Sequence, residues 1–324
     1  MREIYWNRMK YEHLFTPVRI EQINQIDSFK HEFGFIGSCF SDHMFQRFRH
    51  HGLGAWISPF GTTYNPISIV NQLLASLDLV NDFNLTTQGG QYFYWETSHK
   101  ISAQSPEELK GSVVKMRLAS KLALQNMDTL FITLGSAWAY ELKATGLIVA
   151  NCHKIPASFF SKRLLGITEI TDALHELFTR LKQINPFLNI VLTVSPVKHL
   201  RDGIVENSRS KARLIEACHS MAESSLGCYY FPAYEILVDE LRDYRFYEKD
   251  GAHPTEFAID IVFNALKTAI FTSNLEAVLL EIARIRHMEQ HRFTAQSNAA
   301  DIEKHQGLIE SSKMRLNAHY EIQW

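Results

Sequence analysis

Two side chains that could act as nucleophiles stand next to each other early in the chain. Ser38 and Cys39 follow Gly37 at the end of the apolar run FGFIG, and a helix-like pattern begins directly after them. A hydroxyl or a thiol attacks a carbonyl when a neighbouring base accepts its proton. The turn at 37–39 is therefore a candidate catalytic site if the chain also supplies a base and an acid.

A base and an acid stand together near residue 250. In the segment DGAHPTE, Asp250 precedes His253 by three residues, and Pro254 opens the last helix expected in the main part of the chain. A carboxylate at this spacing can turn back to the imidazole and hold one tautomer, as in a nucleophile–histidine–acid triad. Such spacings are common by chance, so a structural role is the alternative. The place of the pair before a last helix favours catalysis.

The elements that must position these residues alternate between strands and helices. Apolar, β-rich runs predict strands at 33–36, 56–57, 128–135, 189–197 and within 228–237. Helical spacing predicts helices at 41–51, 66–77, 106–126, 170–184, 208–225 and 255–271. Hairpins are expected at 89–100 and 139–154. This alternation predicts a parallel sheet that is covered by helices on both faces.

Polar residues follow several of the predicted strands. Sites in open parallel sheets form beyond the carboxyl ends of the strands, where 37–39, Gly135 and the segment SPVKH are expected to lie. His199 ends that last segment, and His153 in NCHK also adjoins a predicted strand. Either histidine could line a pocket, although a hydrogen-bonded structural histidine is the more common role.

Composition limits the class of protein. The 324 residues carry a net charge of −2, with a pI near 6.7, which argues against a nucleic-acid-binding protein. No run is long and apolar enough to span a bilayer, and residues 1–15 lack the apolar stretch of a signal peptide. We therefore expect a cytoplasmic location. The four cysteines fit no zinc-ribbon or CxxC spacing, so neither a metal nor another cofactor is expected.

The composition changes near residue 274. Beyond it, charged residues alternate with apolar ones at heptad-like spacing, which predicts two helices with a break near Ser297-Asn298. The expected division is a domain at 1–273 and a helical C-terminal extension at 274–324. We favour packing of these helices on the main domain. The alternative is a partner surface, for example one that forms a homo-oligomer.

The order of the motifs resembles the SGNH/GDSL hydrolase superfamily, with a nucleophile after the first strand and D-x-x-H before the last helix. Within it, the chain resembles the GSCFA family. That motif reads GSCFS at 37–41, with Ser41 in place of alanine. Further similar stretches are SPFGTTYNPISI, TLGSAWAYE, NCHKIP, SPVKHLRDGIVENSRSKA and FPAYEILVDELRDYRFYEKDGAHP. The resemblance covers about residues 15–270 and implies a flavodoxin-like three-layer α/β/α sandwich with a central parallel sheet.

The resemblance also implies roles for single residues. The superfamily's first block reads Gly-Asp-Ser, which places Cys39 at the position of the nucleophile; a shift of one residue would place Ser38 there. His253 would be the base and Asp250 the acid that orients it. A helix N-terminus and a nearby imidazolium lower the pKa of a thiol, so we expect a lowered pKa at Cys39. The alternative is that Cys39 is a small buried residue.

An oxyanion hole is the remaining part that the resemblance implies. Its donors would be the backbone N–H groups of Cys39 and Gly61. Gly135 matches the glycine of the superfamily's third block, but the asparagine that normally follows it is missing. By motif context, Asn65 and Asn151 are the nearest replacements.

Taken together, these parts imply an esterase-like hydrolase or an acyltransferase that forms an acyl-enzyme. The substrate would be an acylated carbohydrate or another small ester. The missing asparagine and the altered first block favour an alternative, a catalytically weak or inactive binding module on the same fold. A metal-dependent hydrolase has the least support, because no third and fourth ligands accompany Asp250 and His253 at a recognised spacing.

Overall fold

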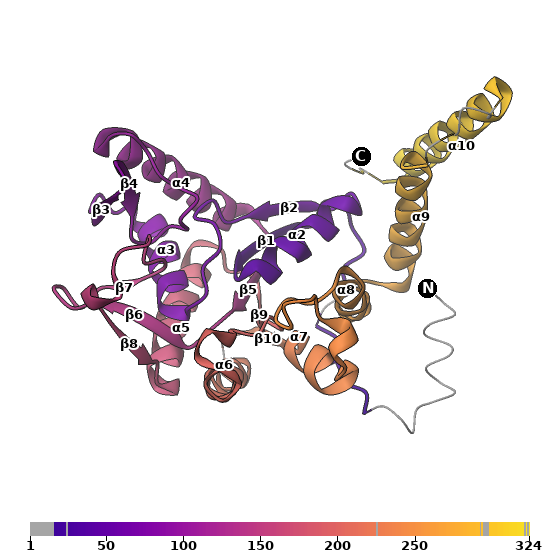
Figure 1. Cartoon of the computed structure of the whole chain (residues 1–324). Coiled ribbons are helices and arrows are strands. Elements are labelled where there is room, and N and C mark those ends of the chain that lie inside the picture. The colour runs from indigo at the N-terminus through magenta and orange to yellow at the C-terminus, as the bar shows by residue number, and fades with distance from the viewer. Residues whose placement is uncertain are drawn as a thin grey trace.

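The computed structural model describes residues 16–324 apart from 24, 225, 292, 294–297, 321 and 323. Within this part, five parallel strands form a central sheet in the order β10-β9-β5-β1-β2 (Figure 1). They are β1 (Glu32–Gly37), β2 (Gly54–Ile57), β5 (Thr129–Leu134), β9 (Asn189–Val194) and β10 (Cys228–Phe231). Counted along the chain, this is the flavodoxin-like order 2-1-3-4-5. The predicted fold class is confirmed.

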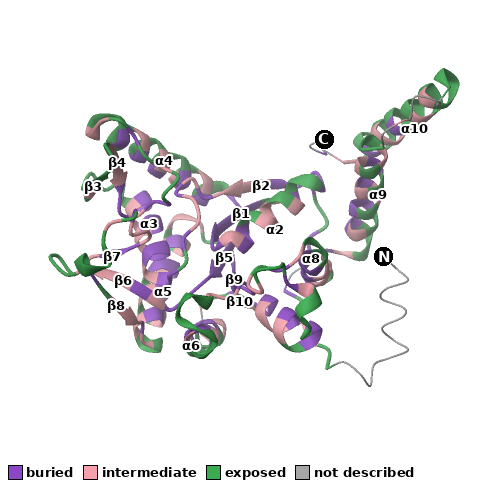
Figure 2. Cartoon of the chain, in the orientation of Figure 1, coloured by how far each residue is buried: buried purple, intermediate pink, exposed green. Residues whose placement is uncertain are grey.

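Helices cover both faces of this sheet. The aromatic core on one face packs α2 (Cys39–His50), α8 (Glu256–Ile270) and α9 (Ser273–Glu289) against β1. The aliphatic core on the other face contains side chains of α3 (Pro66–Asp78), α4 (Pro106–Asn126), α5 (Ile167–Ile184) and α6 (Ile204–Ala222). Successive side chains of a strand point to opposite faces of the sheet, so each strand contributes residues to both cores. Phe35 and Val191 lie in the aromatic core, and Ile36 and Leu192 lie in the aliphatic core. Figure 2 shows the strands buried between the layers.

Two small antiparallel sheets are added to this sandwich. β3 (Leu85–Gln88) and β4 (Gln91–Tyr94) form a hairpin that begins four residues before the predicted one. β6 (Trp138–Leu142) pairs with β7 (Ile148–Val149) as predicted, and on its other side with β8 (Phe160–Leu164). The sequence pattern missed β8 because its motif FSKRL is short and its side chains are mostly half-exposed.

The boundaries of several helices differ from the predicted ones. α2 begins at Cys39, two residues early, because the Ser38 hydroxyl accepts a hydrogen bond from the Phe40 amide and acts as its N-cap. α5 and α6 also begin early, and residue 225, the predicted end of α6, lies outside the described residues. Short elements complete the chain: η2 (Ala157–Phe159), η3 (Leu200–Asp202), α7 (Ala233–Glu235), η4 (Ile236–Leu241) and η5 (Tyr244–Phe246).

The C-terminal extension consists of α9 and α10 (Ala299–Asn317), which project from the body of the molecule (Figure 1). Leu275, Leu279 and Ile282 of α9 are nevertheless fully buried, and they belong to the aromatic core that also contains residues of β1, α2 and α8. Residue 297, part of the predicted break, lies outside the described residues. Among the described helices, none combines the length and the apolar character needed to cross a membrane. Formation of a homo-oligomer through α9 and α10 remains a prediction.

The turn between β1 and α2 requires a glycine. Gly37 has φ +129°, and a Cβ atom there would lie 2.1 Å from the carbonyl oxygen of Thr133 on β5. The backbone approaches this closely because the Ser38 amide donates to that same oxygen at 3.1 Å. The Thr63 amide donates to the Gly37 carbonyl at 2.8 Å, which fixes the turn from its other side.

We expect Gly37→Ala to lower the free energy of unfolding by about 3 kcal/mol, because the added methyl group must displace the β5 backbone. Urea denaturation followed by circular dichroism measures this. The matched control is Gly111→Ala on α4, where a Cβ atom would meet no atom within 4 Å. That change should stabilise the protein by about 0.5–1 kcal/mol. Equal stabilities of the Gly37→Ala variant and the wild type would contradict this close approach of Gly37 to β5.

Candidate active site

The two neighbouring nucleophile candidates have different environments. Ser38 is 1% exposed, and its hydroxyl oxygen accepts the Phe40 amide at 3.3 Å. Cys39 is the first residue of α2 and is half-buried. The Ser38 oxygen is thus engaged in capping the helix, whereas the thiol of Cys39 stands at the carboxyl edge of the sheet with partial access to solvent.

The electrostatics at Cys39 differ from expectation. Burial raises the pKa of the thiol above its usual value, and the negative charge of Asp42 raises it further. The amides of Cys39 and Phe40 and the charge of Lys211 oppose this rise without outweighing it. The expected lowering of the Cys39 pKa by the helix N-terminus is therefore wrong, because burial dominates. The thiol is protonated in the resting protein near neutral pH.

Asp250 and His253 form the expected acid–histidine pair. The Nδ1 atom of His253 donates to Oδ2 of Asp250 at 2.6 Å, and the other carboxylate oxygen accepts the amides of Ala252 and His253 at 2.8 and 3.0 Å. These hydrogen bonds, first of all those from His253, hold the pKa of Asp250 well below its usual range. The carboxylate fixes the tautomer with Nδ1 protonated and leaves Nε2 as an acceptor.

The loop that carries this pair adjoins the helix that carries Cys39. His43 lies one turn after Cys39 on the same face of α2, and its Nδ1 atom is 3.5 Å from a carboxylate oxygen of Glu256, in the first turn of α8. The charge of His253 contributes to the lowered pKa of His43, which burial chiefly causes. The Lys198 amide also donates to the Ala252 carbonyl at 3.0 Å, which ties the loop to the end of β9.

Three of the residues expected around the oxyanion hole form hydrogen bonds within the protein. The Gly61 amide donates to the Ser58 carbonyl at 3.3 Å, and the Gly135 amide donates to Tyr64 at 2.8 Å. The Asn65 side chain caps α3 and donates to the Val149 carbonyl at 3.2 Å. Their oxyanion role remains a prediction, and it requires these bonds to open.

Asn151 and His153 belong to one structured turn. The side-chain oxygen of Asn151 accepts the His153 amide at 2.8 Å, and His153 takes φ +47°. The buried imidazole of His153 contacts the Tyr94 carbonyl at 3.0 Å and stacks on Phe93. Burial lowers the pKa of His153 to about 4. The contacts of His153 are those of a buried, hydrogen-bonded structural histidine, the alternative to a residue that lines a pocket. Asn151, in contrast, faces a cavity.

A cavity of about 630 Å³ lies beside these residues. Tyr64, Asn65, Ser136, Asn151 and His199 are part of its wall. Neither Cys39 nor His253 is in that wall, but electrostatic effects link them to it. A Cys39 thiolate raises the pKa of Tyr64 further, after burial, and the charge of His253 contributes to the lowered pKa of His199. Two hydrogen bonds show the same proximity: the Thr63 amide, next to Tyr64, donates to the Gly37 carbonyl, and the Lys198 amide, next to His199, donates to the Ala252 carbonyl. The cavity therefore lies beside the residues that flank Cys39 and His253.

Lys211 is a functional candidate that the sequence reading did not single out. It is 1% exposed, and its Nζ atom donates to the carbonyls of Gly135 and Ser195, both at 2.7 Å. These carbonyls follow β5 and β9, so the amine joins two adjacent loops at the carboxyl edge of the sheet. Burial lowers its pKa to about 7, and a charge on Cys39 opposes this change.

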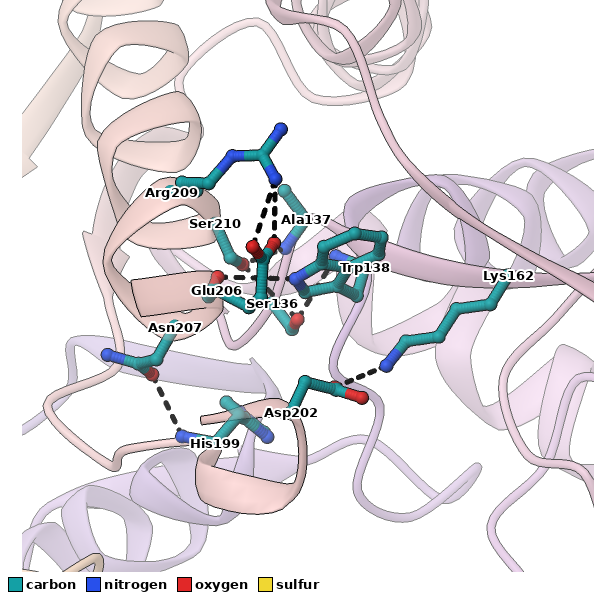
Figure 3. A network of polar contacts seen from close by, with 10 residues as sticks. All are labelled: Ser136, Ala137, Trp138, Lys162, His199, Asp202, Glu206, Asn207, Arg209 and Ser210. Atoms are coloured by element: carbon teal, nitrogen blue, oxygen red, sulfur yellow. Dashed lines mark hydrogen bonds and ion pairs between the residues drawn. The ribbon is translucent and has the colours of Figure 1, made fainter. Parts of the chain in front are cut away.

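Further polar residues on the same face of α6 hold the neighbouring loops (Figure 3). The Asn207 side chain accepts the amide of His199 at 2.9 Å. The Ser210 hydroxyl accepts the amide of Ala137 at 2.7 Å, and the indole of Trp138 donates to the Glu206 carbonyl at 3.2 Å. The first turns of α6 therefore act as a polar support for the strand ends.

The sequence model of the GSCFA family matches residues 32–266. The chain belongs to the GSCFA family. No curated protein shows significant sequence similarity to it. The match includes the turn at 37–39, Lys211 and the 250–253 loop, and it ends before α9. The family assignment that the motifs suggested is thus confirmed.

The sequence of this GSCFA chain contains one pattern from which the buried polar residues of α6 could have been predicted. Asn207, Ser210 and Lys211 occupy helical spacings that continue with Leu214, Ala217 and Cys218, all of them buried. Polar residues on the apolar face of a helix need partners inside the protein.

The described residues contain no cluster of three histidine, cysteine or carboxylate side chains that could hold a metal ion.

We expect the stability that the GSCFA chain gains from Lys211 to depend on pH. The folded pKa of about 7 lies below the ordinary value of 10.5, so between these pH values the unfolded state binds more protons. Relative to a Lys211→Met variant, the wild type should gain unfolding free energy as pH rises from 7 to 10. Urea denaturation at several pH values tests this. Lys115→Met, at an exposed position, is the control and should show no such trend. A difference between wild type and Lys211→Met that is constant with pH would contradict the lowered pKa.

Proposed function

We propose that the chain is an ester hydrolase or acyltransferase of the SGNH type, with Cys39 as the nucleophile. The observation that carries this proposal is the hydrogen-bonded pair of Asp250 and His253, 2.6 Å apart, in a loop next to the helix that begins with Cys39. The flavodoxin-like order of the sheet supports it, because sites in such sheets form at this edge.

In the proposed reaction, Nε2 of His253 accepts the thiol proton while the sulfur of Cys39 attacks the ester carbonyl. Asp250 holds the imidazole and stabilises the imidazolium that forms. When the tetrahedral intermediate collapses, the carbon–oxygen bond breaks, and the alcohol leaves with the proton from His253. The remaining thioester then passes its acyl group to water or to a second alcohol, with the same histidine as the base.

The raised pKa of Cys39 fits a mechanism in which the base acts during the attack. A preformed thiolate would not need a base at that moment, whereas a neutral thiol does. Ser38 is the weaker candidate, because the residue is 1% exposed and its hydroxyl caps α2. The substrate class that we propose is an acylated carbohydrate or another small ester.

A specific observation favours the alternative of a binding module. Gly61, Gly135 and Asn65 already donate their hydrogen bonds within the protein. Loss of one oxyanion donor typically slows catalysis about 10²–10³-fold. A protein with fewer oxyanion donors could keep the cavity and bind an ester without turning it over.

We expect Cys39→Ala and His253→Ala each to lower kcat/KM for short acyl esters by about 10³-fold or more, because each change removes a partner of the proton transfer. Hydrolysis of 4-nitrophenyl acetate and of an acetylated sugar measures this. The control is His175→Ala, an exposed histidine on α5. Ser38→Ala should keep turnover and lose about 1 kcal/mol of stability through its lost cap. Full turnover in both the Cys39→Ala and the His253→Ala variants would refute the proposal.

Alkylation of Cys39 should depend steeply on pH. Because burial raises its pKa, the thiolate fraction is small at neutral pH, and reaction with iodoacetamide should accelerate about tenfold per pH unit above 7. Peptide mass spectrometry locates the label, and Cys39→Ala shows the background from the other thiols. Fast alkylation of Cys39 that does not change between pH 6 and 8 would instead indicate a preformed thiolate.

A further inference from the structure

The wall of the cavity is rich in positive charge. Lys154, Lys162, Lys198 and Arg201 all line it, against a single acidic side chain in the same wall, Asp202. The chain as a whole carries a net charge of −2, so this concentration does not reflect the overall composition. A concave wall with an excess of positive charge raises the local concentration of anions.

The partners of these cations leave the excess positive charge uncompensated. Asp202 forms its ion pair with Lys162. Within the described part of the chain, no carboxylate forms an ion pair with Lys154, Lys198 or Arg201. The Nζ atom of Lys198 instead lies 3.6 Å from the ring centroid of Tyr247 and 4.4 Å from that of Tyr244. Aromatic faces attract a cation without neutralising its charge.

The rest of the wall combines flat aromatic rings with amide groups. Trp138, Tyr140 and Tyr64 contribute rings, and Asn151 contributes a side-chain amide. Lys162 lies over the rings of Trp138 and Tyr140, at 4.9 and 5.4 Å from their centroids. Rings supply stacking area for a sugar, and amides supply hydrogen bonds to hydroxyl groups.

We propose that this cavity binds the alcohol part of the substrate, and that this part is a carbohydrate with an anionic group, a carboxylate or a phosphate. The inference rests on the proposed function for the place of the acyl group, at Cys39. Tyr64 and His199 form the side of the cavity nearest Cys39 and His253. The Thr63 amide, next to Tyr64, donates to the Gly37 carbonyl at 2.8 Å, and the Lys198 amide, next to His199, donates to the Ala252 carbonyl at 3.0 Å. The anionic group lies among Lys154, Lys198 and Arg201.

Binding to the full-length Cys39→Ala variant tests this inference separately from catalysis. Titrations followed by ligand-observed NMR would compare glucuronate, glucose 6-phosphate and neutral glucose at low ionic strength. We expect at least one anionic sugar to bind about tenfold more tightly than glucose, and 0.3 M NaCl to remove most of this preference. Tighter binding of glucuronate points to a carboxylate, and tighter binding of the phosphate points to a phosphorylated sugar.

Paired charge substitutions locate the binding site. A Lys154→Gln/Arg201→Gln variant should bind the preferred anion about tenfold more weakly, since each exposed cation contributes modestly. The matched control is Lys110→Gln/Lys115→Gln, which removes two exposed lysines from α4 and should leave affinity unchanged. Equal binding of all three sugars, or unchanged affinity in the Lys154→Gln/Arg201→Gln variant, would overturn the inference. Anion binding without any ester turnover in the wild type would refute the proposed function and, with it, the assignment of this cavity to the alcohol part of an ester. The finding that the cavity binds an anionic sugar would still stand.

Discussion

The candidate site depends on one buried amine. Lys211 is 1% exposed and donates to the carbonyls that follow β5 and β9. Removal of an ammonium ion from water costs several kcal/mol, and its pKa of about 7 shows that burial is incompletely compensated. A neutral amine has two N–H groups, and the two carbonyls satisfy both. All hydrogen-bond donors of the neutral amine therefore have a partner, whereas an ammonium ion has a third N–H group that needs one.

This amine also couples the strand ends to the thiol. A negative charge on Cys39 raises the pKa of Lys211, and the positive charge of Lys211 lowers that of Cys39. Each group therefore favours the charged state of the other. Burial shifts the pKa of both groups toward the uncharged form. A protonated Lys211 would therefore stabilise negative charge that develops near Cys39.

The positions of the strands could be predicted from the sequence better than the electrostatics of the candidate site. Apolar runs at 33–36, 128–135 and 189–197 indicate buried strands whatever their neighbours are, because the signal is local. The Asp250–His253 bond is also local, since three residues separate the partners. The pKa of Cys39 depends instead on burial by distant segments and on Asp42, so helix position alone gave the wrong direction.

The difference between local patterns and contacts of distant segments also explains why neither Lys211 nor the cavity was predicted from the sequence. Lys211 acts through carbonyls 76 and 16 residues away in the chain, and no local pattern encodes such partners. The cavity collects residues from β6, β8 and η3, and β8 itself was not predicted. Its charge is invisible in the composition, because the acidic residues that balance it lie elsewhere on the chain. The shape and charge of the cavity therefore depend on the packing of the small antiparallel sheet against α6, whereas the positions of the candidate catalytic residues depend on the central parallel sheet.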